Sequence, residues 1–553
     1  MNPRRGRSYT PPMRVGIGQF NAHVGAIATN RERMLSLLAE AREQRCDLVI
    51  FPELAVCGYS PLDGMWRPGY VAACEDAVDA IRAASEGIGV VVGSITGHAH
   101  REPINRYDLS SLADGAETDL FNSAIFIADG EVAGRASKIH LPCYDVYDES
   151  RYFTPGPGSE VFSFRGVTLG LNVCEDLWVD GGPTELQASL GAAWIINISA
   201  SPFYVGKPEI RRRLVHRRAK ENGVGIVYAN LVGGQDEAVF DGGSFIVNGD
   251  GELVFQAPTF VEGLFVADLA DSASVPAAKP SDLEQLREAL VLGIRDYVGK
   301  NGFTSAIVGL SGGIDSALVT ALAVEALGPE HVTAVYLPSR YSAEQSGTDA
   351  RELAERLGIE LLAISIGEAH EAVRKAMPEP PTGLADENTQ PRIRATIWMA
   401  LANQRNALVL CAGNKSEIAI GYSTLYGDTT GALAPIADLY KSVVYRLAKS
   451  LGERIPRSIV ERPPTAELRP DQRDDDDLPP YEVLDPLLRH IIDENRSRRE
   501  LIAMGIDAEL VDWVLARYHA NEHKRRQLPP GIKVTPKAFG LGRRVPITNA
   551  YTD

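Results

Sequence analysis

Ser305-Ala-Ile-Val-Gly-Leu-Ser-Gly-Gly-Ile-Asp-Ser-Ala-Leu318 joins an apolar strand to a glycine- and serine-rich turn and then to the start of a helix. The glycines at 309, 312 and 313 leave room for backbone N–H groups to close on an anion. Apolar residues then recur at 318, 319, 322, 323 and 326, which is the spacing of one buried helix face. The N-terminus of that helix would add N–H donors and a partial positive charge. The stretch therefore predicts a phosphate-binding loop.

The type of phosphate chemistry follows from what this loop contains. Its residues are Gly309, Leu310, Ser311, Gly312, Gly313, Ile314, Asp315 and Ser316. Because the Gly-Lys-Ser/Thr of a Walker A loop is missing, transfer of the γ-phosphate is not expected. The loop resembles the SGGxDS loop of ATP pyrophosphatases, which implies that it holds the β,γ-phosphates of ATP while a substrate oxygen takes the AMP. A purely structural turn would not explain both hydroxyls and the aspartate.

Length and composition restrict the class of protein. A chain of 553 residues is too long for one core, and 44% hydrophobic with 23% charged residues is typical of a soluble globular protein. The net charge of -17 argues against nucleic acid or an anionic membrane as a partner. The six cysteines form no CxxC pair, so neither a disulfide framework nor a zinc site is indicated. The sparse cysteines favour a reducing cytoplasm as the location, and we expect neither a secretory signal in the first twelve residues nor a membrane helix.

Two domains joined by a linker are expected, at residues 13–270, 271–282 and 283–553. In the first domain, one or two clear helices, the best of them at 31–45, accompany many strands, which favours sheets packed between helical layers. The expected strands are 15–20, 48–51, 90–95, 123–128, 167–173, 194–198 and 226–231, followed by a hairpin at 244–255.

The second domain alternates strands and helices, which predicts a doubly wound parallel sheet with its ligand at the carboxyl edge of the strands. We expect strands at 305–310, 332–337 and 360–366, and helices at 315–327 and 343–357. Residues 376–388 and 462–480 are predicted to be loops, and the acidic run 474–477 is predicted to be solvated.

Three residues of the first domain could form a nucleophilic site. Cys174 ends a strand, where the turn would expose its sulfur. Glu53 also follows a strand and could exchange a proton with the thiol, while Lys138 could stabilise a thiolate and a developing oxyanion. A single cysteine is more often a small buried hydrophobic residue, and sequence spacing alone does not bring these three together.

Three motifs of this domain resemble the nitrilase superfamily and occur in its order: Phe51-Pro-Glu-Leu-Ala-Val-Cys-Gly-Tyr59, Ser137-Lys-Ile-His-Leu-Pro142 and Leu171-Asn-Val-Cys-Glu-Asp-Leu-Trp178. The resemblance implies an α-β-β-α sandwich with Glu53 as base, Lys138 as electrostatic partner and Cys174 as the nucleophile that forms a thioester. Glu149 matches the second glutamate of the family, which would orient the lysine. Residues implied to contact glutamine are Tyr59, Tyr144, Glu149, Trp178, Ser201 and Lys207.

From about residue 283 onward the chain resembles NAD synthetases. The similar stretches are Tyr336-Leu-Pro-Ser-Arg-Tyr-Ser342, Glu387-Asn-Thr-Gln-Pro-Arg-Ile-Arg394 and Gly413-Asn-Lys-Ser-Glu-Ile-Ala-Ile-Gly-Tyr-Ser-Thr-Leu-Tyr-Gly-Asp428. The resemblance implies ATP contacts at Ala412, Lys441 and Thr465, besides the phosphate loop, and deamido-NAD contacts at Asn388, Glu417 and Lys524. Asp315 and Glu417 would hold Mg²⁺ against the triphosphate. Ala412 departs from the family, which has a threonine there, so one hydroxyl contact to ATP is missing.

Together the two halves resemble the family of glutamine-dependent NAD synthetases. The resemblance implies that glutamine supplies ammonia and that ATP adenylates deamido-NAD, with pyrophosphate leaving before ammonia displaces AMP. It also implies a homo-oligomer larger than a dimer, with an octamer expected. Two alternatives remain: an ATP-pyrophosphatase amidotransferase that makes another product, and an amidase that ATP merely regulates.

Overall fold

A computed structural model of the chain describes residues 13–98, 119–269, 280–470, 472 and 476–551. The chain divides into two compact units. Unit 1 contains Met1–Gln235 and Phe240–Pro280, and unit 2 contains Asp236–Val239 and Ser281–Asp553. Residues 1–12 and most of the expected linker at 271–282 lie outside the described residues.

Unit 1 contains two six-stranded sheets. In order across the first sheet lie β14 (Gly263–Asp268), β1 (Arg14–Gln19), β2 (Leu48–Ile50), β3 (Gly89–His98), β4 (Asp119–Ala128) and β5 (Glu131–Ser137). In order across the second lie β13 (Leu253–Gln256), β12 (Phe245–Val247), β9 (Gly225–Asn230), β8 (Trp194–Ser199), β7 (Val167–Val173) and β6 (Val161–Phe164). The central strands of each sheet pair in parallel, and the outer strands pair antiparallel. A separate hairpin pairs β10 (Val232–Gln235) with β11 (Ala238–Asp241).

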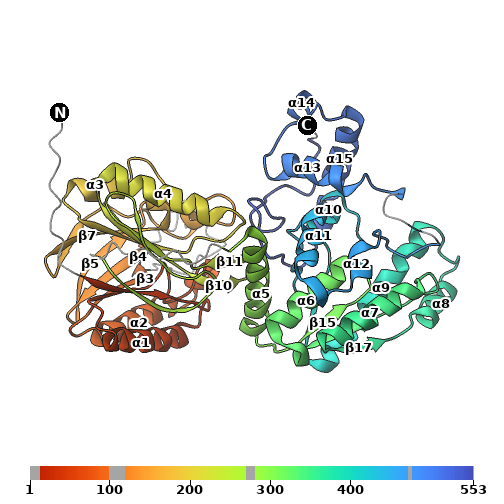
Figure 1. Ribbon diagram of the computed structural model, residues 1–553, viewed down its shortest axis with the longest axis horizontal. Helices are drawn as coiled ribbons and strands as arrows, with labels where there is room; N and C mark the ends of the chain where they lie inside the picture. Colours follow the sequence, from red (N-terminus) through yellow and green to blue (C-terminus); the bar gives the residue numbers. More distant parts are fainter. Residues whose placement is uncertain (1–12, 99–118, 270–279, 471, 473–475, 552–553) are drawn as a thin grey trace, which may run out of the picture. The chain divides into compact units, whose positions relative to one another are not determined.

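The core of unit 1 lies between its two sheets. One buried apolar cluster joins Ile17 and Ile50 of the first sheet to Leu171 and Ile196 of the second. Helices cover the outer faces, with α1 (Ile27–Glu43) and α2 (Tyr70–Ala83) on the first sheet and α3 (Pro183–Ser189) and α4 (Lys207–Asn222) on the second (Figure 1). The expected α-β-β-α sandwich is therefore confirmed.

Helices of unit 1 differ most from the sequence predictions. Helix α1 begins at Ile27 rather than at residue 31. Helix α4 was not predicted, because its sequence KPEIRRRLVHRRAKEN carries too few apolar residues to show a helical period. Two of its buried residues are Arg211 and Arg218, which a hydrophobic pattern cannot reveal.

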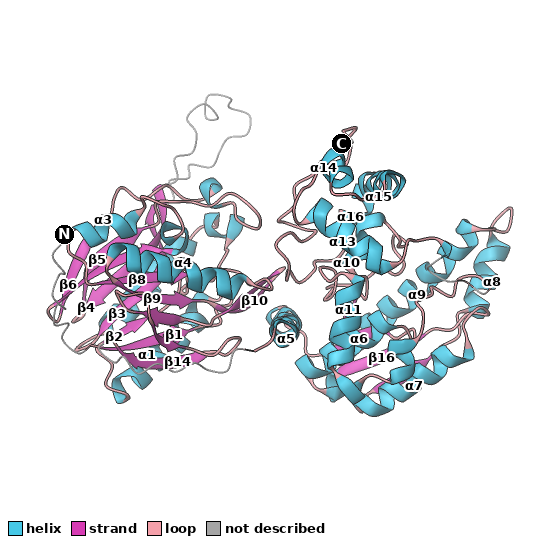
Figure 2. Ribbon diagram, turned by 45° about the horizontal axis from the view of Figure 1, so that its top comes forward, coloured by secondary structure: helices cyan, strands magenta, loops and turns pink. Residues whose placement is uncertain are grey.

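Unit 2 is built on a four-stranded sheet in which every pair is parallel, as predicted. Its order is β17 (Glu360–Ala363), β16 (Val332–Tyr336), β15 (Ala306–Gly309) and β18 (Leu408–Leu410). Helices α5 (Asp282–Lys300), α6 (Ile314–Leu327), α7 (Glu344–Leu357) and α9 (Leu384–Arg405) accompany the sheet (Figure 2). The strand order reverses at β15, and such a switch point is where doubly wound sheets bind ligands.

The rest of unit 2 is largely helical, with α8 (Gly367–Ala376), α10 (Lys415–Ile420), α11 (Lys441–Ser450), α12 (Arg457–Glu461), α13 (Tyr481–Ile492), α14 (Arg498–Ala503), α15 (Ala508–Ala520) and α16 (Glu522–Arg525). Of these, α10, α13, α14 and α15 contribute to a second apolar core that includes Tyr440, Leu484 and Val514.

One loop prediction in unit 2 is wrong. Residues 376–388 were expected to be a loop, but α9 begins at Leu384 and continues past Pro391. The helix persists across the proline because its buried residues, including Ile393 and Ala402, pack into the apolar cluster of the sheet. Part of the acidic run 474–477 lies outside the described residues, and Asp477 forms an ion pair with Arg469 at 3.0 Å.

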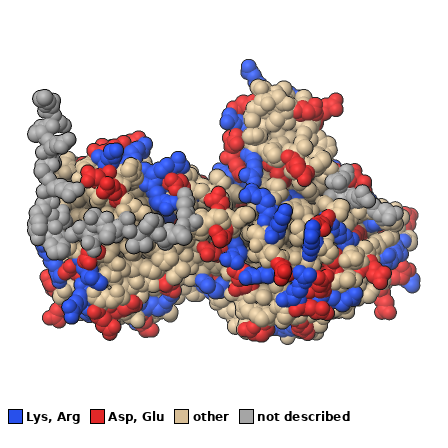
Figure 3. All heavy atoms as spheres, viewed as in Figure 1, with Lys and Arg blue, Asp and Glu red and all other residues tan. Residues whose placement is uncertain are grey.

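One face of the molecule shows how its charged side chains are distributed. On the face drawn in Figure 3, acidic and basic side chains are interspersed over both units. Within the described residues, no helix combines the length and apolar character that a bilayer crossing requires.

Candidate functional sites

The first site is a buried cluster of charged groups in unit 1. Glu53 follows β2, Lys138 follows β5, and Cys174 follows β7, so each lies at the carboxyl end of a strand. Lys138 Nζ donates to Glu53 Oε1 at 2.8 Å and to Glu149 Oε1 at 2.7 Å. Lys138 and Glu53 are fully buried, and Glu149 is nearly so. One ammonium group lies between two carboxylates, so these buried charges offset one another although water does not reach them.

Glu53 is fixed by three donors, of which the sequence suggested only one. Besides Lys138, Asn122 Nδ2 donates to Glu53 Oε1 at 2.7 Å, and the backbone N–H of Ala200 donates to Oε2 at 2.7 Å. Close packing adds to this, since a Cβ at Gly93 would lie 2.3 Å from the carbonyl oxygen of Pro52. Asn122 lies within β4, where a lone asparagine gives no sequence signal of a role.

Glu149 holds the lysine from the other side. Its Oε1 also accepts a hydrogen bond from Tyr59 Oη at 2.7 Å. Burial raises the pKa of Glu149 to about 7, with Glu53 adding to this and Lys138 opposing it. Burial by itself would lower the pKa of Lys138, but the carboxylates of Glu149 and Glu53 raise it well above its usual value. The lysine is thus a permanent cation.

Cys174 is more enclosed than the sequence suggested. We expected the turn to expose its sulfur, but the residue is 3% exposed and lies in the core cluster between the sheets. Its φ of 44° places it in the left-handed region, where the strand changes direction sharply. Burial, with the negative charge of Glu53, raises the pKa of the thiol well above its usual value despite Lys138. At rest the thiol therefore keeps its proton and needs a base to become a nucleophile.

Asp176 ties the lysine segment to the cysteine turn, and the sequence did not single it out. Its Oδ1 accepts the backbone N–H groups of Ile139 at 3.1 Å and His140 at 2.9 Å, directly after Lys138. Its Oδ2 accepts the N–H of Val173, directly before Cys174, at 3.3 Å. Asp176 therefore fixes the backbone that follows Lys138 relative to the backbone that precedes Cys174.

The remaining glutamine candidates include both exposed and buried side chains. Tyr144 is half exposed and donates to Glu175 Oε2 at 2.9 Å, next to the cysteine. Lys207 Nζ lies 4.0 Å from the ring centre of Trp178, which is a cation–π contact. Ser201 is buried, and its backbone N–H donates to Asn230 Oδ1 at 2.9 Å.

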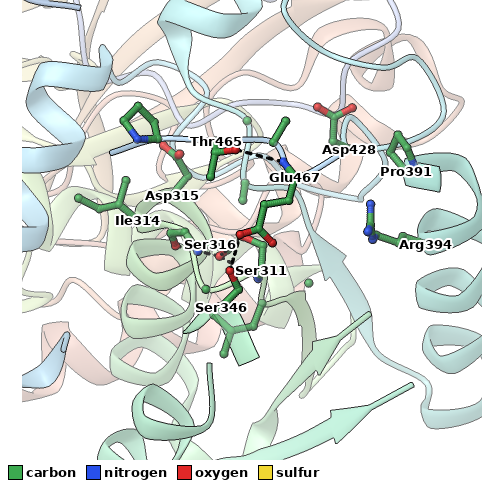
Figure 4. Close-up of a pocket in the computed structure, with 18 of the residues that line it drawn as sticks. Ser311, Ile314, Asp315, Ser316, Ser346, Pro391, Arg394, Asp428, Thr465 and Glu467 are labelled. Carbon is green, nitrogen blue, oxygen red and sulfur yellow. Dashed lines mark hydrogen bonds between the residues drawn. The ribbon is translucent and has the colours of Figure 1, made fainter. Parts of the chain in front are cut away.

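The second site is a cavity of about 290 Å³ in unit 2, at the carboxyl ends of β15, β16 and β18. Every residue of the predicted phosphate loop lines it, as do Ala412, Glu417, Lys441 and Thr465 (Figure 4). Gly312 has a φ of 83°, and a Cβ there would lie 2.5 Å from the carbonyl oxygen of Ser346. Only glycine fits this turn.

The two loop hydroxyls and the aspartate have distinct contacts. Ser311 Oγ and Ser316 Oγ lie 3.0 Å apart and close the loop on itself. Lys441 Nζ donates to Asp315 Oδ2 and, at 3.1 Å, to Glu417 Oε1. Burial by itself would lower the pKa of Lys441, but the negative charges of Asp315 and Glu417 raise it above its usual value. Thus Asp315 and Glu417 face one point in the cavity.

Asn388 and Lys524 do not line this cavity but contact a segment that does. Thr424, a lining residue, donates to Asn388 Oδ1 at 2.7 Å. Lys524 Nζ donates to the carbonyl oxygens of Gly421 at 2.6 Å and Ser423 at 2.8 Å. Both therefore support the chain that follows α10.

Arg394, Asp428 and Glu467 also line the cavity, although reasoning from the sequence assigned a role to none of them. Thr465 Oγ1 accepts the backbone N–H of Glu467 at 3.3 Å, and Glu467 Oε1 accepts a hydrogen bond from Ser346 Oγ at 2.6 Å (Figure 4). Burial raises the pKa of Asp428 to about 6. Arg394 also lines the cavity and was quoted only as the last letter of a motif.

Two family models match the chain, one on each half. Residues 14–278 match Carbon-nitrogen hydrolase, and residues 286–529 match NAD synthase. A glutamine-dependent NAD(+) synthetase of Synechocystis is 40% identical, covering 97% of this chain and 99% of that one. One of Xylella fastidiosa is 43% identical, covering 98% and 99%.

Solved structures agree with these sequence matches. A glutamine-dependent NAD+ synthetase from Acinetobacter baumannii, in complex with adenosine diphosphate, has a TM-score of 0.76 and 36% identity, covering 98% of this chain and 99% of that one. Since the similarity to curated relatives runs over almost the whole length, the chain belongs to the glutamine-dependent NAD(+) synthetase family.

Proposed function

We propose that the chain makes NAD from deamido-NAD, with ATP as the activating substrate and glutamine as the source of ammonia. Residues 13–270 are the glutaminase, residues 283–553 are the synthetase, and 271–282 join them. The observation that carries the proposal is the buried Glu53–Lys138–Glu149 cluster beside Cys174, combined in one chain with a phosphate loop at a sheet switch point. Membership of the family agrees with both sites.

The glutaminase step begins with the protonated thiol. Glu53 takes the proton as Cys174 Sγ bonds to the amide carbon, and the carbonyl electron pair moves to oxygen. Lys138, a permanent cation, stabilises that negative charge. The intermediate collapses as Glu53 returns the proton to nitrogen, the C–N bond breaks, and ammonia leaves a thioester. Glu53 then activates a water molecule, which releases glutamate and restores the thiol.

The glutamine contacts have separate tasks in this proposal. Glu149 keeps Lys138 in place by accepting its hydrogen bond at 2.7 Å, and Tyr59 in turn donates a hydrogen bond to Glu149 at 2.7 Å. Tyr144, Trp178, Ser201 and Lys207 bind the substrate, with the ammonium group of Lys207 receiving its α-carboxylate while remaining against the Trp178 ring.

The synthetase step activates a poor electrophile. A carboxylate oxygen of deamido-NAD bonds to the α-phosphorus of ATP, and the bond to the β,γ-pyrophosphate breaks, with its electron pair leaving on pyrophosphate. Ammonia then attacks the acyl carbon, AMP leaves with the electron pair of the C–O bond, and one proton is lost to give the amide. The phosphate loop, Ala412, Lys441 and Thr465 bind ATP, whereas Asn388, Glu417 and Lys524 bind deamido-NAD.

Asp315 and Glu417 are the residues that would hold Mg²⁺. Their donor set fits, because carboxylate oxygens are hard ligands and Mg²⁺ usually uses one or two of them besides substrate phosphates. Both carboxylates already converge on the cation of Lys441. In this proposal the phosphates of ATP complete the shell. When bound, the metal would offset the negative charge of the triphosphate.

The assembly is proposed to be a closed homo-oligomer larger than a dimer, with eight copies in a cytoplasmic enzyme. Light scattering of the purified chain tests this, and a monomeric mass at working concentration would contradict it.

The function itself is tested by measuring three products together. Glutamine, ATP and deamido-NAD should yield glutamate, AMP and NAD in equal amounts. AMP without NAD would indicate a different acceptor, and glutamate without AMP would indicate an amidase that ATP only regulates.

A further inference from the structure

The synthetase cavity has an excess of negative charge before any nucleotide arrives. Its lining contains three cationic side chains, Arg394, Lys441 and Arg462, and four carboxylic ones, Asp315, Glu417, Asp428 and Glu467. A triphosphate adds further negative charge. Whether each cationic side chain is already paired with a carboxylate therefore determines how the cavity can bind the triphosphate.

Two of the three cations are already engaged by carboxylates. Lys441 lies between Asp315 and Glu417. Arg462 pairs with Glu467 at 2.6 Å. The positive charges of Lys441 and Arg462 are therefore largely neutralised by carboxylates of the protein itself.

Arg394 differs from both, since no described carboxylate lies within ion-pair distance of its guanidinium. Its Nε donates to the backbone carbonyl oxygen of Leu337 at 2.9 Å. Among the described residues its two terminal nitrogens have no hydrogen-bond partner. Burial lowers its pKa to about 10, although the negative charges of Glu467 and Asp428 oppose this. The group is thus a partly desolvated cation, still charged at neutral pH, that an anionic ligand would stabilise.

Its position identifies the part of ATP that it would meet. Leu337 follows β16, and the phosphate loop follows β15, its parallel neighbour in register. Neighbouring strands are about 4.8 Å apart. A group beside the end of β16 is therefore separated from the phosphate loop by a distance that one phosphate group can span. In Figure 4, Arg394 lies on the side of the cavity opposite Ile314 and Asp315. With the β,γ-phosphates on the loop, the α-phosphate is the anion nearest Arg394.

We propose that Arg394 is a catalytic residue of adenylation, whose two terminal nitrogens bind the α-phosphate of ATP. This rests on the proposed function. As the carboxylate oxygen bonds to the α-phosphorus, two anions approach each other and the bond to pyrophosphate breaks. A planar guanidinium matches two phosphate oxygens and stabilises this crowded negative charge, whereas the ammonium of a lysine cannot form the same fork.

The test uses the two diastereomers of ATPαS, in which sulfur replaces one or the other non-bridging α-oxygen. NAD formation from ammonium is measured with each, so the glutaminase plays no part. If Arg394 binds one of these oxygens, the wild-type rate ratio of the diastereomers should change at least fivefold in Arg394→Met. A smaller change overturns the proposal. With ordinary ATP, kcat of this variant should fall about 100-fold or more, the usual loss when a preorganised transition-state donor is removed.

Two further variants make the result interpretable. Arg405→Met removes another arginine of α9, one that is paired with Glu360, and should keep the wild-type ratio. If Arg394→Met does not fold, Arg394→Lys retains the charge but loses the fork and should show the same change in ratio. Glutamate release reports folding of the other unit in each case. A wild-type chain that makes no NAD from ammonium would refute the proposed function, independently of Arg394.

Discussion

Replacing Gly312 by alanine should impair adenylation through backbone geometry alone. Gly312 has a φ of 83°, a conformation that costs an L-residue about 1–2 kcal/mol. The new Cβ would lie 2.5 Å from the carbonyl oxygen of Ser346, whereas ordinary contacts begin near 3.4 Å. The loop must therefore shift by about 0.9 Å relative to α7, since 3.4 less 2.5 is 0.9. A misplacement of about 1 Å at a reacting group lowers the rate roughly 100-fold.

The assay is AMP and NAD formation from ammonium at saturating ATP, with glutamate release as the measure of unit 1. Gly313→Ala is the matched control, because Gly313 has a φ of −89° and its added Cβ would meet only the Ser311 hydroxyl, at 3.2 Å. We expect about a 100-fold loss in Gly312→Ala, at most about a tenfold loss in Gly313→Ala, and unchanged glutamate release in both. Equal losses in the two variants would refute the argument from strain.

Four other outcomes can be checked. Cys174→Ala should make no NAD from glutamine, whereas ammonium should restore a comparable maximal rate; retained use of glutamine would exclude the nucleophile assignment. Asp315→Asn should stop AMP and NAD formation and leave glutamate release largely intact, and equal loss of both activities would argue against separate sites. Ala412→Thr should leave activity intact or lower KM for ATP by up to roughly tenfold, the effect of one neutral hydrogen bond; a collapse with the fold preserved would contradict this. The pKa of Glu149 is raised from 4.5 to about 7, so the folded chain binds that proton more tightly than the unfolded chain, and its contribution to stability falls as pH rises between those values. The difference in Tm between wild type and Glu149→Gln should decline across that window, and a constant difference would exclude the effect.

The sequence predicted elements well where burial makes a simple pattern. Strands such as β7 and β8 are almost wholly buried, so they read as continuous apolar runs with clear ends. Helix α4 has no such pattern, because it buries Arg211, which makes a two-bond ion pair with Asp241 at 2.8 and 3.1 Å. A charged residue that is satisfied inside the protein cannot be distinguished from a solvated one by sequence spacing.

The same limit applies to the catalytic cluster. Glu53, Lys138 and Cys174 were recognised through motifs, and the structure brings them together at strand ends, but their roles stay predictions. Asn122 and Asp176 could not be recognised, because their importance lies in which atoms they contact across the sheets. Arg394 is similar, since only the cavity shows that, among the described residues, no carboxylate lies within ion-pair distance of its guanidinium.

The division of the glutaminase site between two sheets has a consequence for biosynthesis. Glu53, Asn122 and Lys138 come from the first sheet, whereas Cys174 and the Ala200 N–H come from the second. A ribosome that has exposed only the first 150 residues would therefore present the proposed base and cation without the proposed nucleophile. In the proposed mechanism, the thiol would become competent only after β8 has emerged and the sandwich has closed on it. An incompletely synthesised chain should therefore not hydrolyse glutamine. In the folded protein, a local separation of the two sheets should stop hydrolysis before the rest of the unit unfolds.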